Sequence, residues 1–249
     1  MHVPPVPLPT TPSAAEPGRP TPSAATLLML TDSRLPSGAY AHSGGLEPLA
    51  TTRPGARADA GAARLGGVRT LGELRRFLDG RLHTGGLVAA AVAAAATGDA
   101  IPLDDLDVAT SARMPSAAAR QASRRQGRQL LRVAATAWPS PVYRRLSRMP
   151  HHAMALGIVA RVGGLQPVDA AVAAAYGAVS GPASAAVRLL ALDPLAVQAV
   201  LTGLAPKIDR VAAVAVAAAE DGRIPMPSAP LLELAAEDHA TWEVRLFAS

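Results

Sequence analysis

Apolar residues recur at helical spacing along most of the chain, and alternation typical of β-strands is rare. A helix predicted to begin at Thr70 places its leucines on one face, namely Leu71, Leu74, Leu78 and Leu82. A second series follows Pro194, and Pro206 within it predicts a kink. The pattern therefore predicts an all-α fold.

Glycine and proline divide the chain into about ten short helices. Interruptions are expected at Gly85–Gly86, before a buried helix that ends at Gly98, and at Gly181–Pro182. The last helix is expected to start near Ser228 and run almost to the C-terminus. Other helices are expected over about 116–137 and 152–162.

The composition indicates one domain with a tail. Residues 1–25 contain eight prolines and little to bury, so they are predicted to be a disordered, partly polyproline II tail. Residues 26–249 are predicted to form a single helical domain. Aromatic residues make up only 3% of the chain, so its core is expected to consist of closely packed small side chains.

Several classes are disfavoured by what the sequence lacks. It has no cysteine, which excludes disulfides and thiolate metal sites. No basic start followed by an apolar run opens the chain, and the apolar stretch 87–96 falls short of the roughly 20 residues that span a bilayer. We therefore expect a cytoplasmic protein that does not enter a membrane.

The stretch LPSGAYAHSGGLE, residues 35–47, is unusually rich in turn formers. In one interpretation it caps the following helix, with Gly44 as N-cap and Glu47 at the third helical position. That interpretation does not explain Tyr40 and His42, which are costly in a plain turn. The alternative is a functional segment.

Catalytic and metal sites find little support. Ser37, Ser43 and His42 do not form a nucleophile-elbow motif, and no strand precedes them. No two histidines stand four residues apart as a helical metal pair would. His239 lies on an apolar stripe, which favours a packed, hydrogen-bonded histidine over a metal ligand.

Arginines carry most of the net charge of +5. A ridge repeats every four residues, at Arg120, Arg124, Arg128 and Arg132, with Arg125 beside it. It is either a solvated face or an electrostatic docking surface. Nucleic acid is not the expected partner, because no aromatic residues alternate with these arginines for base stacking.

Two further features have two interpretations each. Arg188 follows a run of small residues, and either extends from a packed helix or contacts a partner across an interface. The chain closes with Trp242, Leu246 and Phe247, although chain ends are usually polar. This tail either folds back onto the core or awaits another chain.

Taken together, these segments resemble the UreF family of urease accessory proteins. The opening stretch matches the family signature at Pro36, Gly38, Ser43, Gly45, Leu46 and Glu47. Gly127, the segment 151–189 and the ending H-x5-RLF-x-S from His239 also match. Departures are Ala39, Tyr40 and His42 in the signature and Ala248 in the tail.

The resemblance implies an all-α homodimer without enzymatic activity and without a stably bound cofactor or metal. It implies binding to the scaffold UreD (also called UreH), recruitment of the GTPase UreG, and nickel delivery by the complex into the urease apoprotein. Glu47 is expected to face the GTPase, and the tail is expected to be ordered by the scaffold. The candidate partner-binding residues are Pro36, Gly38, Tyr40, His42, Ser43, Gly45, Glu47, Arg188, His239, Arg245, Leu246 and Phe247.

Overall fold

The structure, a computed structural model, describes residues 24–51, 67–98 and 100–248. The predicted disordered tail and the predicted loop 51–67 lie almost wholly outside these residues. Within them the chain begins as a helix at Ala24, two residues before the expected start of the domain.

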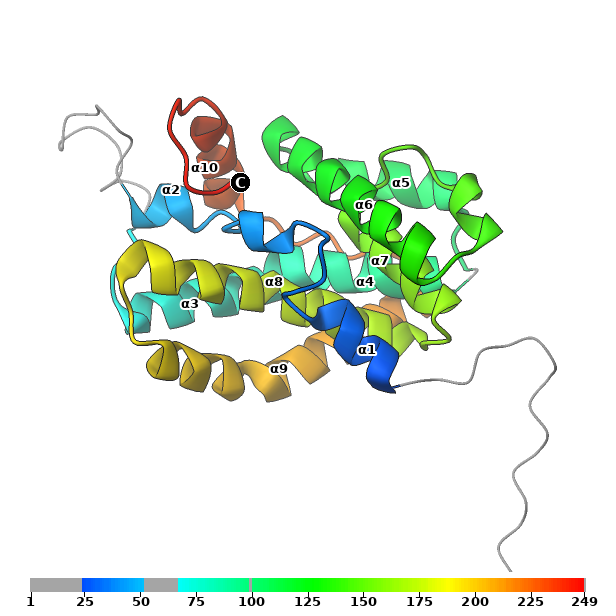
Figure 1. The fold of residues 1–249 in the computed structure, drawn as a ribbon, viewed down its shortest axis with the longest axis horizontal. Helices are drawn as coiled ribbons and strands as arrows, with labels where there is room; N and C mark the ends of the chain where they lie inside the picture. Colours follow the sequence, from blue (N-terminus) through cyan, green and yellow to red (C-terminus); the bar gives the residue numbers. More distant parts are fainter. Residues whose placement is uncertain (1–23, 52–66, 99, 249) are drawn as a thin grey trace, which may run out of the picture.

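Every regular element in the described part of the chain is helical, which confirms the predicted fold class (Figure 1). The elements are α1 (Ala24–Thr31), η1 (Ala39–Ala41), α2 (Glu47–Ala50), α3 (Leu71–Arg81), η3 (Leu82–Gly86), α4 (Leu87–Thr97), α5 (Leu103–Ala112), α6 (Ala117–Ala137), η4 (Pro141–Arg145), α7 (His152–Val162), α8 (Pro167–Leu190), α9 (Pro194–Glu220) and α10 (Pro230–Ala240).

The core is centred on α4, which packs against α7, α8 and α9 (Figure 1). Alanine and glycine allow these helices to approach closely. A Cβ atom at Gly157 of α7 would collide with the carbonyl oxygen of Ala93 and would lie 2.7 Å from the Ala96 side chain. The Thr97 hydroxyl also donates a hydrogen bond to the Gly157 carbonyl at 3.1 Å. Small side chains therefore allow the close packing that the composition predicts, and leucines such as Leu74 and Leu78 fill the rest of the core.

The predicted break at Gly85–Gly86 is wrong. The chain continues from α3 through a single π-helical segment, η3, directly into α4. A Cβ at Gly86 would lie 3.3 Å from the Ala178 side chain of α8. Glycine here permits a close helix–helix approach instead of ending the helix.

The predicted break at Gly181–Pro182 is also wrong, because α8 runs unbroken from Pro167 to Leu190. Pro182 has no amide hydrogen, so it cannot bond the carbonyl of Ala178 four residues earlier. The Arg81 Nε donates to that carbonyl at 2.9 Å instead. Burial lowers the pKa of Arg81 to about 10. A side chain from α3 thus satisfies the group that the proline leaves unpaired.

The last helix is shorter than predicted. α10 begins at Pro230 and ends at Ala240, and the residues after it turn back beside α2 and η1 (Figure 1). By contrast, α6 and α7 span the predicted residues 117–137 and 152–162.

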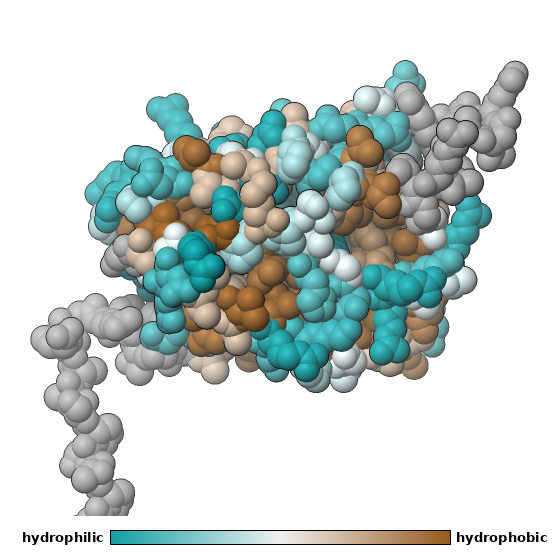
Figure 2. Space-filling model, turned by 180° about the vertical axis from the view of Figure 1, so that it is seen from behind, coloured by the Kyte–Doolittle hydropathy of each residue, from teal (hydrophilic) through white to brown (hydrophobic). Residues whose placement is uncertain are grey.

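One helix, α8, is long and apolar enough to cross a membrane by length and composition alone. Its most apolar window is 56% buried inside the protein, as expected for a core helix. On the face shown in Figure 2, apolar residues form separate patches among polar ones.

Candidate functional site: a junction of the two chain ends

The opening stretch is shaped by three glycines with positive φ, Gly38, Gly44 and Gly45. Side chains are strained in this region of backbone conformation, which glycine adopts freely. At Gly44 a Cβ would also lie 2.8 Å from Pro182 and 3.1 Å from the Arg81 guanidinium. The stretch therefore follows the surface of α8 too closely for any other residue at position 44.

Glu47 is the first residue of α2, not the third helical residue that the capping interpretation predicts. The N-cap is Leu46, whose side chain makes no capping hydrogen bond. The Glu47 backbone amide instead donates to the Ser43 hydroxyl at 3.1 Å. This leaves the Glu47 carboxylate available for contacts far along the sequence.

The Glu47 carboxylate holds the C-terminal tail. Its Oε1 accepts a hydrogen bond from the Leu246 amide at 2.8 Å, and its Oε2 accepts one from the Phe247 amide at 3.0 Å. The His239 Nε2 lies 3.0 Å from the same Oε2. Glu47 is only 3% exposed and His239 only 2%, so this cluster is enclosed by the protein. Three partners satisfy a carboxylate that would be very costly to bury alone.

Arg188 completes the junction from α8. Its guanidinium carbon lies 4.5 Å from the centre of the Phe247 ring, and its Nη2 donates to the Tyr40 carbonyl at 3.1 Å. The Ala248 amide donates to the Ala41 carbonyl at 2.7 Å. Of the two interpretations of the tail, the structure therefore shows the one in which it folds back onto its own chain.

His239 is the packed, hydrogen-bonded histidine that the sequence predicts. Its ring meets Trp242 edge to face, with centroids 5.0 Å apart. Burial lowers the pKa of His239, and attraction to Glu47 offsets this only in part. Because a carboxylate oxygen can only accept, Nε2 is a protonated ring nitrogen and donates to Glu47.

The structure brings the candidate residues from both chain ends to one place and buries some of them. Glu47 faces its own chain, so in this conformation its carboxylate does not face a partner as expected. The exposed part of the junction includes large apolar side chains, with Tyr40 66% exposed, Val244 66% and Leu246 73%, and the charged Glu243 and Arg245 are exposed among them.

The remaining candidates lie around this junction. Pro36 and Arg245 are exposed, and Ser43 is fully buried. Gly38 lies against the Gln129 side chain of α6. His42 is partly buried, and this burial lowers its pKa to about 4, with His152 and Arg125 contributing. Because Ser43 is fully buried, its hydroxyl has no access to a substrate in this conformation.

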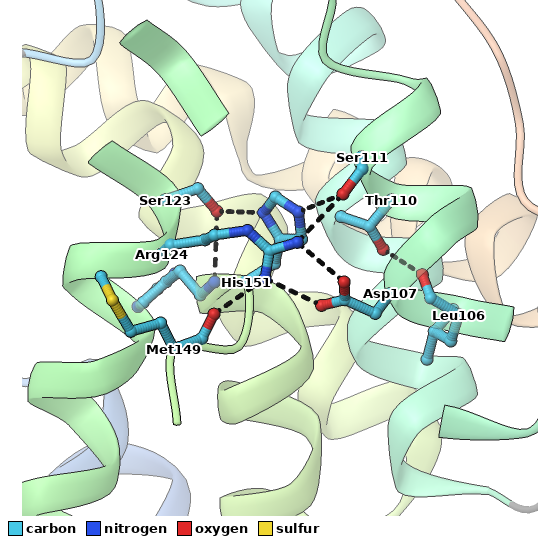
Figure 3. Close-up of polar contacts among 9 residues, drawn as sticks. Leu106, Asp107, Thr110, Ser111, Ser123, Arg124, Met149 and His151 are labelled. Carbon is cyan, nitrogen blue, oxygen red and sulfur yellow. Dashed lines mark hydrogen bonds and ion pairs between the residues drawn. The ribbon is translucent and has the colours of Figure 1, made fainter. Parts of the chain in front are cut away.

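Sequence reasoning missed a second, partly buried polar cluster, centred on the buried His151 (Figure 3). His151 Nε2 lies 2.9 Å from the Ser111 hydroxyl of α5, and Nδ1 lies 3.1 Å from the Ser123 hydroxyl of α6. His151 is also the N-cap residue of α7. One imidazole thus links three helices.

Arg124 closes this cluster. Its guanidinium pairs with Asp107 at 2.7 Å and donates to the Met149 carbonyl at 2.8 Å and to Ser111 at 3.1 Å (Figure 3). Gly127, a position that carries the family resemblance, makes the cluster possible. A Cβ there would collide with the Pro150 carbonyl oxygen and lie 3.0 Å from the His151 carbonyl carbon.

Neither cluster has the composition of a metal centre. Across residues 24–51, 67–98 and 100–248, no group of three or more His, Cys, Asp or Glu could hold a metal ion. The fold and the junction define a class: an all-helical protein in which segments around residues 40–47 and 239–248 are joined by a buried carboxylate beneath a surface that exposes Tyr40, Val244 and Leu246.

Comparison with known proteins identifies the family. A family model described as UreF matches residues 68–205. The "Urease accessory protein UreF" of Mycobacterium sp. (strain JLS) is 43% identical over 224 residues, which cover 90% of this chain and 98% of the relative. The protein of the same name from Mycolicibacterium vanbaalenii is 42% identical over 91% of this chain and 99% of its own length. In Mycobacterium marinum it is 42% identical over 90% and 98%. The chain belongs to the UreF family, and these relatives carry the name of an accessory protein, not of an enzyme.

Proposed function

We propose that this protein is a non-enzymatic accessory factor in the maturation of urease. It acts in the cytoplasm as a homodimer, together with the scaffold UreD/UreH and the GTPase UreG, and promotes nickel insertion into the urease apoprotein. Nickel is cargo of the complex and not a resident cofactor of this chain.

The observation that carries the proposal is the convergence of the two segments that most resemble the family. The opening signature and the RLF-containing tail are nearly 200 residues apart, yet Glu47 and Phe247 are joined by a 3.0 Å hydrogen bond. The junction presents the exposed Tyr40, Val244 and Leu246 above this buried support. Exposed apolar residues on an ordered base suit the docking of another protein.

Removing the protein from its host tests this function. A strain that lacks the gene is expected to accumulate urease polypeptides without nickel, measured as metal content and activity of the purified enzyme. The same strain complemented with the intact gene is the control. Normal nickel content and activity without the gene would refute the proposal.

A nucleic-acid-binding helical protein is the alternative. The arginine content of the chain motivates it, and a salt titration with DNA or RNA separates the two, since submicromolar, steeply salt-dependent binding would support the alternative.

A further inference from the structure

A row of arginines extends along the exposed side of α6. Arg125, Arg128 and Arg132 are each exposed, and spacings of three and four residues place them on one face of the helix. Arg124, by contrast, points into the partly buried cluster with Asp107. The predicted ridge is therefore split: Arg124 is structural, and a neighbouring set of arginines faces solvent.

The segment after α6 extends this row. The Arg124 guanidinium reaches the Met149 carbonyl, so residues 141–149 return along the helix. Arg144 and Ala135 line the same surface hollow, and Ala135 follows Arg132 by three residues on the same face. Three exposed arginines lie on this returning segment. We call the set that these positions place together the cationic stripe: Arg125, Arg128, Arg132 and Arg144.

The fold does not neutralise this charge. No aspartate or glutamate occurs between residues 108 and 168 of the sequence. Among the described residues, no carboxylate forms an ion pair with an arginine of the cationic stripe. Like charges one helical turn apart repel by roughly 0.2–0.5 kcal/mol. The stripe therefore costs the isolated protein stability and creates a local positive potential that attracts anions.

The surroundings of the stripe favour a polypeptide over a nucleic acid. The aromatic residues beside it, Trp138 and Tyr143, are partly buried, and the Tyr143 hydroxyl donates to the Trp138 carbonyl at 2.8 Å. Single-stranded nucleic acids usually bind by stacking bases on exposed aromatic rings. Successive arginines of the stripe on α6 are separated by about 4.5 and 6 Å along the helix axis. Alternate residues of an extended chain are about 6.7 Å apart, a comparable spacing.

We propose that the cationic stripe binds an extended acidic segment of another protein, with carboxylates at alternate positions paired to the arginines of α6. This inference does not rest on the proposed function in urease maturation, because it assigns a surface outside the junction. The stripe adjoins the opening stretch, since the Gln129 side chain of α6 lies against Gly38. An acidic segment bound there would lie beside the junction without covering it.

Fluorescence anisotropy with the full chain tests the proposal. The probes are a labelled peptide with glutamate at alternate positions, a labelled peptide of the same length with glutamine instead, and a labelled single-stranded oligonucleotide. We expect the glutamate peptide to bind, the glutamine peptide not to bind, and affinity to fall at least about tenfold between about 50 and 300 mM NaCl, because exposed charge pairs are screened by salt.

Matched triple variants locate the binding surface. Arg125→Gln/Arg128→Gln/Arg132→Gln is expected to weaken binding of the glutamate peptide by about tenfold or more, since it removes the charges that steer and hold the peptide. Arg75→Gln/Arg76→Gln/Arg210→Gln removes the same charge from exposed positions on α3 and α9 and is expected to change affinity less than about twofold. The lysine version of the first triple is expected to retain most of the binding, and far-ultraviolet circular dichroism checks that each variant is folded.

Three results would overturn the proposal. Absence of peptide binding at the lower salt concentration is the first. Equal weakening by the two glutamine triples is the second, because it would indicate a response to net charge alone. The third is an oligonucleotide that binds more tightly than the glutamate peptide and loses affinity in the α6 triple, which would assign the stripe to nucleic acid.

Discussion

Glu47 shows how much a single buried carboxylate can organise. It accepts hydrogen bonds from two backbone amides of the tail and one from His239, and it is fixed in turn by the bond of its own amide to Ser43. Bonds to a charged acceptor are stronger than neutral ones. The order of the C-terminal tail therefore depends on one side chain near the start of the chain.

The change Glu47→Gln tests this dependence. Glutamine keeps the size but replaces one acceptor oxygen with an NH₂ group, which faces a backbone N–H donor or the imidazole. We expect a loss of about 1–3 kcal/mol in the free energy of unfolding, and faster amide hydrogen exchange at residues 246 and 247. Glu243→Gln, at an exposed position of the same tail, is the control. Unchanged exchange in the Glu47 variant would show that the carboxylate does not hold the tail.

Gly127 is the second residue whose identity the packing dictates. Gly127→Ala places a methyl group against the Pro150 carbonyl and the His151 backbone. Because backbone atoms cannot move aside cheaply, we expect a loss of at least about 2 kcal/mol in denaturant unfolding. Gly203→Ala in α9, where a Cβ meets nothing within 4 Å, is expected to stabilise by up to about 1 kcal/mol. Equal effects of the two substitutions would contradict the packing argument.

At the scale of the element, α5, α6 and α7 are tied together by the neutral imidazole of His151. Burial is the main cause that lowers the pKa of His151 to about 4, and Arg124 and Arg120 add to it while Asp107 opposes it. An unfolded histidine has a pKa near 6.5. The folded state therefore binds fewer protons, and its stability is complete above about pH 6.5 and declines as the pH falls towards 4.

We predict that chemical denaturation followed from pH 7.5 to 4.5 will show this decline. The contribution of His151 is at most about 3 kcal/mol, because one pKa unit corresponds to 1.36 kcal/mol. In His151→Asn, whose side chain does not titrate in this range, the slope of unfolding free energy against pH is expected to be smaller, even if the variant is less stable at pH 7.5. Identical slopes would mean that His151 does not contribute to the pH dependence.

The sequence predicted elements well where the signals are local. Thr70 and Glu73 form the capping box at the start of α3, and Gly98 ends α4 as expected. The helix breaks predicted at Pro182 and at Gly85–Gly86 are wrong, because contacts with α3 and α8 allow the helix to continue there. A distant arginine that replaces a backbone donor leaves no trace in local spacing.

The same limit applies to the junction and to the second cluster. Local spacing gives no sign that Glu47 meets His239 and Phe247, which lie almost 200 positions away. No histidine stands four residues from His151, so local spacing does not mark it either. The sequence places Pro150 directly before His151. The close approach of these two residues to Gly127 of α6 is visible only once the helices are placed.

At the scale of the whole molecule, the junction has two parts. Glu47, His239 and Phe247 are buried and support it, whereas Val244 and Leu246 are exposed and form its contact surface. Cutting the chain after Asp238 would remove His239, Trp242 and Phe247 along with the exposed residues, and would leave the Glu47 carboxylate without its three hydrogen-bond partners. Such a truncation would both destabilise the protein and remove its exposed contact residues, so a loss of partner binding would not distinguish the two causes. Substitutions of the exposed residues alone separate the two effects.

Leu246→Ser with Val244→Ser makes this separation. Both side chains are largely exposed, so we expect the free energy of unfolding to change by less than about 0.5 kcal/mol. Under the proposed function, co-purification with UreD/UreH is expected to fall several-fold, because the apolar docking surface is lost. Leu195→Ser, at another exposed leucine on α9, is the control. Undiminished co-purification would exclude this part of the junction as the scaffold contact.

The pairing of residue 47 with residue 247 has a consequence for biosynthesis. Residue 47 is synthesised about 200 residues before the tail amides that its carboxylate binds, so this buried acid meets its partners only after residues 239–247 have left the ribosome. A product terminated before residue 239 would contain the opening stretch, residues 35–47, without the tail residues that bind the Glu47 carboxylate. Formation of the junction is thereby linked to the synthesis of residue 247.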